Sequence, residues 1–172
     1  LKVRGDLTFL DIIARQILHA RKIFNARLPL IFMDSIYTSD DTLEYLKKYP
    51  ELAEKDLPLD FLQNFVVKLR ADNLSPIDWP TNPNLEWSPP GHGDIYTVLW
   101  SSGLLKRLID AGYKYMHVSN SDNLGAIPSA TLAGWFAKSG APFAIEACKR
   151  TVNDKKGGHL AIRKLDNQMI LR

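Results

Sequence analysis

Three polar loops hold most of the side chains that could do chemistry. The first, residues 89–94, has the sequence Pro-Pro-Gly-His-Gly-Asp and leads into a helix that we expect to begin near Asp94. Glycines on both sides of His92 allow the backbone to approach a ligand closely, and a helix N-terminus offers free N–H groups to an anion. His92 could therefore hydrogen-bond a base or a phosphate. The same residues also fit a rigid loop in which Asp94 only caps the helix.

The second loop, residues 119–125, has the sequence Ser-Asn-Ser-Asp-Asn-Leu-Gly and follows an apolar segment expected to be a strand. Carboxylate and amide oxygens, such as those of Asp122 and Asn120, suit Mg²⁺ that is held together with substrate phosphates. Ligands of open α/β sheets bind beyond the carboxyl ends of the strands. The position therefore favours a binding role, and the alternative is an Asx-rich turn that bonds its own backbone.

The third loop, residues 149–158, is basic and ends in the glycine pair Gly157-Gly158. Taken alone, it is typical of a solvated loop with a glycine turn. Gln63 lies in an expected strand or extended segment, where its amide could read the edge of a pyrimidine. A single exposed amide is more often only solvated, so this interpretation needs further support.

The elements that must position these loops follow from the hydrophobic pattern. Apolar residues at helical spacing predict helices over residues 6–25, 39–47, 94–111 and 128–138, with Asp6 as the cap of the first. Apolar runs predict strands over residues 28–33, 61–69, 115–118 and 143–148, and alternation predicts a final hairpin around Asp166-Asn167. Five prolines between residues 72 and 93 predict an extended loop. Strands alternating with helices indicate an α/β fold with a largely parallel sheet, which the final hairpin would make mixed.

Composition narrows the classes of protein. The 172 residues are 45% hydrophobic and 24% charged, which suits a globular chain and excludes disorder. The net charge of +3 is spread along the chain, so it gives no basic stripe for a nucleic acid. The single cysteine, Cys148, allows no internal disulfide and is compatible with a reducing cytoplasm. No apolar run approaches the roughly 18 residues of a membrane helix.

Four segments, in order and with fitting spacing, resemble the UDP-glucose pyrophosphorylase family. They are residues 87–96 (WSPPGHGDIY), 102–105 (SGLL), 118–126 (VSNSDNLGA) and 156–158 (KGG). The resemblance implies a three-layer α/β sandwich with a mixed, mostly parallel, Rossmann-like sheet, as in nucleotide-diphospho-sugar transferases. It also implies uridylyl transfer from UTP to glucose 1-phosphate, which gives UDP-glucose and pyrophosphate with Mg²⁺ as the cofactor.

The resemblance also implies roles for individual residues. Asp122 should be catalytic and bind Mg²⁺ at the nucleotide phosphates, and His92 should be the second catalytic residue. Gln63 takes the place of a glutamine that reads uracil, although its neighbours depart from the family's aromatic-Asn-Gln run. Thr151 and Asp154 are expected to support the third loop. The implied substrate-binding residues are Gln63, Gly91, His92, Asn120, Gly157 and Gly158.

On this resemblance, residues 1–172 are the central part of a catalytic nucleotidyltransferase domain. The family's glycine-rich, lysine-containing loop would precede Leu1, and its later sugar- and phosphate-holding Asn and Lys would follow Arg172. We therefore expect a cytoplasmic enzyme whose isolated central part is inactive. Two alternatives stay open. One is a UDP-N-acetylhexosamine pyrophosphorylase, and the other is a non-catalytic module that binds nucleotide sugars.

Overall fold

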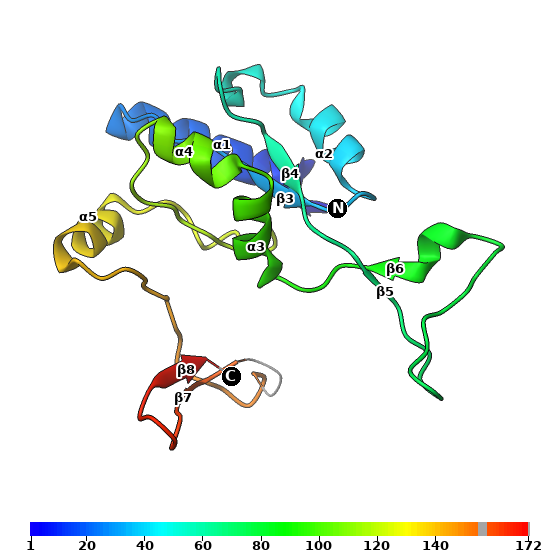
Figure 1. Cartoon of the computed structure of the whole chain (residues 1–172). Helices are drawn as coiled ribbons and strands as arrows, with labels where there is room; N and C mark the ends of the chain where they lie inside the picture. Colours follow the sequence, from blue (N-terminus) through cyan, green and yellow to red (C-terminus); the bar gives the residue numbers. More distant parts are fainter. Residues whose placement is uncertain (155–157, 172) are drawn as a thin grey trace. The chain divides into compact units, whose positions relative to one another are not determined.

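The computed structural model describes residues 1–154 and 158–171, and the chain divides into two compact units, Leu1–Ala133 and Gly134–Arg172 (Figure 1). The first unit begins with the strands and helices that form its main body: β1 (Lys2–Arg4), β2 (Leu7–Thr8), α1 (Phe9–Phe24), β3 (Phe32–Asp34), α2 (Ser39–Leu46), η1 (Pro50–Leu52) and β4 (Asp60–Leu62). It continues with β5 (Val66–Val67), η2 (Pro83–Glu86), β6 (Trp87–Ser88), α3 (Asp94–Ser101) and α4 (Leu104–Asp110). Helix α5 (Ala130–Ser139) runs from the first unit into the second, which also holds β7 (Leu160–Ile162) and β8 (Met169–Leu171).

Helix α1 begins later than expected because its cap is Thr8 and not Asp6. The Thr8 hydroxyl accepts from the Asp11 N–H, and the Asp11 carboxylate accepts from the Thr8 N–H at 2.7 Å, which completes a capping box. Asp11 is 5% exposed and also accepts from the hydroxyls of Tyr45 at 2.6 Å and Tyr49 at 2.7 Å. This network joins the start of α1 to the end of α2 and the residues that follow it. The helix ends at Asn25, whose φ of 45° is left-handed.

Strands β3 and β4 pair in parallel, with Phe32 opposite Asp60 and Asp34 opposite Leu62. Two small apolar cores flank this pair. One is built on Ala14, Leu46 and Leu52 from α1, α2 and η1, and it includes Phe32. The other is built on Leu57, Leu99 and Leu104, and it includes Ile31 and Phe61. Because Ile31 and Phe32 are consecutive in an extended chain, they point to opposite sides and serve different cores.

The helix expected over residues 94–111 is two helices. Gly103 has a φ of 76° and separates α3 from α4, and the Ser102 hydroxyl accepts from the Leu104 N–H at 3.3 Å. A residue in the left-handed region cannot continue an α-helix, and glycine reaches that region without a steric cost. Gly112, with a φ of 87°, ends α4 as its sequence position predicted.

The expected sheet differs from the one in the structure. The described residues form four two-stranded sheets, and of these the β3–β4 pair is parallel and the others are antiparallel. Residues 115–118 and 143–148, expected to be strands, are assigned to no strand, and Met116 and Phe143 are 50% and 63% exposed. An apolar segment becomes a strand only when a neighbouring strand takes up its backbone hydrogen bonds, and no strand of the described residues is paired with either segment.

The second unit contains the hairpin predicted at the end of the chain. Strands β7 and β8 pair antiparallel, with Leu160 opposite Leu171. The turn lies at Asp166-Asn167, where the sequence predicted it, and in it Asn167 has a φ of 56° and Arg163 pairs with Asp166. None of the described helices combines the length and the apolar character that a membrane span requires.

We predict that Asp11→Asn lowers the free energy of unfolding by roughly 2–3 kcal/mol at neutral pH, because it weakens a buried carboxylate network. Burial alone would raise the pKa of Asp11, but hydrogen bonds from Tyr45, Thr8 and Tyr49 outweigh it and lower that pKa. The stabilisation is therefore present above the unfolded pKa of about 3.9 and is lost as the pH falls below it. Urea denaturation from about pH 3 to pH 7 measures this dependence.

Asp6→Asn is the matched control. Within the described residues, the side chain of Asp6 pairs with Lys2 alone, at the surface, where both side chains are largely exposed, so we expect a change under about 0.5 kcal/mol. Equal losses in the two variants, or a loss for Asp11→Asn that does not vary with pH, would contradict this account of the capping network.

Candidate functional site

Two of the predicted site segments, 30 residues apart in sequence, are held together by one carboxylate. Asp94, the first residue of α3, accepts from the Asn64 N–H at 2.7 Å and from the Asn64 Nδ2 at 2.8 Å. Asn64 follows Gln63 directly, and Asp94 closes the loop that contains Gly91 and His92. The structure therefore brings the predicted uracil-reading glutamine to the glycine-histidine loop.

A short ladder reinforces this convergence. Strands β5 and β6 pair antiparallel, with Val66 opposite Ser88 and Val67 opposite Trp87. Phe65 and Trp87 pack edge to face with ring centroids 5.1 Å apart. The residues just after Gln63 are thereby paired with those just before the loop at 89–94. At its other end, the Gln63 N–H donates to the Asp34 carbonyl at 2.8 Å, which fixes Gln63 at the carboxyl end of the β3–β4 pair.

The glycine-histidine loop depends on an unusual backbone conformation. Gly91 has a φ of 120°, a region that residues with a Cβ rarely adopt. The carbonyls of Gly91 and His92 accept from the N–H groups of Asp94 and Ile95, and these bonds start α3. His92 is exposed, so its ring can reach a ligand.

The second predicted loop is a series of tight turns. The Asn123 N–H donates to the Asn120 carbonyl at 3.1 Å, and the Ala126 N–H donates to the Asn123 carbonyl at 3.1 Å. Asn120 and Asp122 are exposed. The side chain of Gln16 on α1 reaches this loop and donates to the Leu124 carbonyl at 3.0 Å. The loop therefore belongs to the same unit as the first site segments, although the strand expected before it is not formed.

The residues around Asp122 fit a Mg²⁺ ion that takes most of its ligands from substrate phosphates and water. Across the described residues, no three His, Cys, Asp or Glu side chains gather into a metal site. Mg²⁺ is, however, commonly held by one or two carboxylates together with substrate phosphates and waters. The exposed carboxylate of Asp122 meets that requirement, and it makes no ion pair with the described part of the chain.

The third loop lies in the second unit. The Asp154 carboxylate accepts from the Thr151 hydroxyl at 2.6 Å and from the Thr151 N–H at 2.7 Å, and these bonds lower the pKa of Asp154. Both residues thus brace the loop, as the sequence suggested. Gly158 is exposed, whereas Gly157, the other glycine expected to contact the sugar, lies outside the described residues.

Asp34, at the carboxyl end of β3, is a buried group that sequence analysis missed. Its Oδ1 accepts from the hydroxyls of Thr38 at 2.9 Å and Thr42 at 3.1 Å, while its Oδ2 is buried and has no hydrogen-bond partner among the residues that the structure describes. Burial raises the pKa of Asp34, and the nearby charge of Asp60 adds to the effect. A signal was present in the sequence, because Asp34 follows the apolar run 28–33 and precedes a Ser- and Thr-rich helix start.

Comparison with known proteins identifies the family. The protein-family model described as UTP–glucose-1-phosphate uridylyltransferase matches residues 1–172, and the chain belongs to this family. The chain is 35% identical over 161 residues to a probable UTP–glucose-1-phosphate uridylyltransferase of Schizosaccharomyces pombe, and 36% identical over 162 residues to one of Solanum tuberosum. Each match takes in 93% of the chain but only 31% and 33% of the relative, so the chain spans about a third of their length.

Solved structures of UDP-glucose pyrophosphorylases resemble this chain over its whole length. The chain superposes on a UDP-glucose phosphorylase of Trypanosoma brucei with a TM-score of 0.90 and 44% identity, over 100% of this chain and 38% of that one. It superposes on a mutant UDP-glucose pyrophosphorylase of Leishmania major, in complex with UDP-glucose, with a TM-score of 0.86 and 40% identity, over 100% of this chain and 39% of that one. The mixed helix-and-sheet structure is therefore that of the family.

We predict that Gly91→Ala destabilises the glycine-histidine loop by about 1–3 kcal/mol and weakens nucleotide binding, because alanine is strained at a φ of 120°. Gly93→Ala is the matched control. Gly93 has a φ of −61°, and a Cβ built on either glycine meets no atom within 4 Å. Thermal unfolding and UDP titration of both variants measure the difference. Equal behaviour of the two variants would show that the conformation of Gly91 is not the constraint.

Proposed function

We propose that the chain is the central part of the catalytic domain of a UTP–glucose-1-phosphate uridylyltransferase. The reaction would transfer the uridylyl group of UTP to glucose 1-phosphate and yield UDP-glucose and pyrophosphate. The observation that carries the proposal is the double hydrogen bond from Asn64 to Asp94, which joins Gln63 to the Gly91–His92 loop. A family relative of Leishmania major was solved with UDP-glucose bound, which supports the choice of ligand.

In the proposed reaction, a phosphate oxygen of glucose 1-phosphate attacks the α-phosphorus of UTP. A new P–O bond forms as the bond to the β-phosphate breaks, and the electron pair leaves with pyrophosphate. The step needs little covalent help from the protein, so positioning and charge neutralisation provide the catalysis. Mg²⁺, where bound, would supply positive charge to the phosphates, and Asp122 is the residue that would hold it.

The side chains would act mainly by binding and orienting the substrates. Gln63 would read the uracil edge, because an amide can both donate and accept hydrogen bonds. Gly91 would let the backbone come close to the uridine, and His92 would donate to a phosphate or the base. Asn120 would contact the ribose or the phosphates. Gly157 and Gly158 would lie against the sugar, where the lack of a side chain allows close approach.

The proposal includes the architecture of the complete domain. We infer a three-layer, Rossmann-like sandwich with a mixed, mostly parallel sheet, in which residues 115–118 and 143–148 become strands beside segments of a longer chain. The apolar cores on both sides of β3–β4 support a sheet between two helix layers. The apolar side chains of four residues in these two segments are exposed, which supports the inference that other strands cover them in the complete domain. They are Met116, Val118, Phe143 and Ile145. On this view the isolated 172 residues turn over no substrate.

We also place the enzyme in the cytoplasm. The single cysteine, Cys148, is an exposed free thiol, which a reducing compartment tolerates well. Fractionation of cells with an antibody to the protein tests this placement, and recovery in a secreted or organelle fraction would overturn it.

We predict that Asp122→Asn lowers pyrophosphate release by the full-length protein at least about 100-fold with Mg²⁺, UTP and glucose 1-phosphate, because it removes the carboxylate that would hold the metal. Asp110→Asn is the matched control. Asp110 is a surface carboxylate that pairs with Lys106 at 2.6 Å on α4, so its loss leaves turnover nearly unchanged.

N-acetylglucosamine 1-phosphate is assayed in parallel as the competing sugar phosphate. Faster release with this substrate would move the protein to the N-acetylhexosamine branch. Folded protein with no release from either sugar phosphate would indicate a non-catalytic module that binds nucleotide sugars and would overturn the proposed function.

A further inference from the structure

One side chain on α1 reaches across 108 residues of sequence to the loop that carries Asp122. The Gln16 Nε2 donates to the main-chain carbonyl of Leu124 at 3.0 Å, and both residues are half-buried. Leu124 is two positions after Asp122. A carbonyl can only accept, so the amide nitrogen of Gln16 must face it, which fixes the orientation of the amide.

The helix end of this contact is rigid. Gln16 lies between Ala14, which is fully buried, and Ala20, which is 6% exposed. Five residues before it, Asp11 accepts hydrogen bonds from Thr8, Tyr45 and Tyr49. Gln16 therefore projects from a helix whose position in the unit is fixed by these contacts. A hydrogen bond from Gln16 fixes its acceptor relative to the same helix.

The loop end has little support of its own. Asn120, Asp122 and Asn123 are exposed, and the bonds inside the loop are local turn contacts, such as that from the Asn123 N–H to the Asn120 carbonyl. Local turns fix the shape of a loop but not its place relative to the rest of the domain. Gln16 supplies a contact that does fix its place.

We propose that Gln16 is a positioning residue that holds the loop of residues 119–125 so that Asp122 and Asn120 meet the nucleotide phosphates and Mg²⁺. The effect of Gln16 on catalysis rests on the proposed function. Its positioning of the loop rests on the hydrogen bond to the Leu124 carbonyl alone. A glutamate at this position has the same shape but cannot donate when ionised, and a leucine cannot donate at all.

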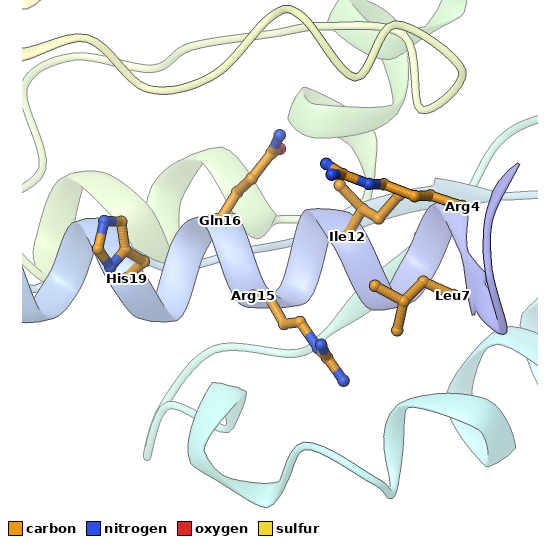
Figure 2. A pocket seen from close by; sticks show the side chains of 6 residues that line it. All are labelled: Arg4, Leu7, Ile12, Arg15, Gln16 and His19. Atoms are coloured by element: carbon orange, nitrogen blue, oxygen red, sulfur yellow. The ribbon is translucent and has the colours of Figure 1, made fainter.

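A ligand-binding role for Gln16 fits the geometry less well. Gln16 lines an open hollow of about 510 Å³ together with Arg4, Arg15 and His19 (Figure 2). Figure 2 shows Gln16 and Arg15 leaving α1 on opposite sides. The amide donor of Gln16 is already used by Leu124. A ligand in the hollow would therefore have to displace Leu124 to use the amide donor of Gln16.

The test compares Gln16→Glu and Gln16→Leu in the full-length protein, with His19→Ala as the matched control. His19 is exposed and lines the same hollow one turn along α1. Hydrogen–deuterium exchange without ligand reports the loop directly. We expect residues 119–127 to exchange several-fold faster in both Gln16 variants, with residues 9–24 unchanged and with no effect in His19→Ala.

The second readout is the Mg²⁺ dependence of pyrophosphate release. We expect kcat to fall about 10- to 100-fold in the Gln16 variants and the Mg²⁺ concentration for half-maximal rate to rise, because a displacement of about 1 Å has costs of that order. A general loss of stability would not shift the Mg²⁺ requirement. Loop exchange and Mg²⁺ dependence equal to those of the unaltered protein in Gln16→Glu would overturn the proposal. If the unaltered protein shows no turnover, the proposed function fails, and loop exchange still decides whether Gln16 positions the loop.

Discussion

The parallel pairing of β3 with β4 is the constraint on which the first unit depends. Parallel neighbours require a crossover, and here α2 and η1 provide it, which brings Leu46 and Leu52 under α1. On the other side, Phe61 contributes to the core that holds α3 and α4. The same ladder ends with the bond from the Gln63 N–H to the Asp34 carbonyl. The pairing that organises the two cores therefore also fixes Gln63, a candidate ligand-binding residue.

From that strand end, polar contacts extend the site outward. Asn64, the residue after Gln63, donates two hydrogen bonds to Asp94. These bonds fix the position of Gln63 relative to the loop of Gly91 and His92. The second loop, residues 119–125, is positioned from α1. The buried Asp11 network fixes α1 in the unit, and Gln16 on α1 donates a hydrogen bond to the Leu124 carbonyl of the loop. The candidate site thus contains two loops, residues 89–94 and 119–125, and hydrogen bonds hold each of them to another part of the first unit.

Local features of the fold could be predicted from the sequence. The helical spacing that ends at Asn25 and the hairpin around Asp166-Asn167 depend on nearby residues, and both are present. The cap of α1 was assigned to Asp6 instead of Thr8, because the partner in the capping box is an aspartate and not the usual Glu or Gln. The break at Gly103 was missed because apolar spacing continues across it.

The non-local features could not be predicted in the same way. Residues 115–118 have the composition of a strand, but a strand also requires a partner, and composition says nothing about where a partner lies. The contacts of Asn64 with Asp94 and of Gln16 with Leu124 join residues 30 and 108 positions apart, and no periodic pattern records them. The motifs therefore indicate which residues could bind a ligand, and the fold determines which of them meet.

A crystal structure of the full-length protein with UDP-glucose and Mg²⁺ would show whether these two loops form the nucleotide site. We predict that the uracil edge contacts Gln63, that the nucleotide lies along the loop containing Gly91 and His92, and that Asp122 lies at the metal and the phosphates. A nucleotide bound away from both loops, with the Asn64–Asp94 contact broken, would contradict it.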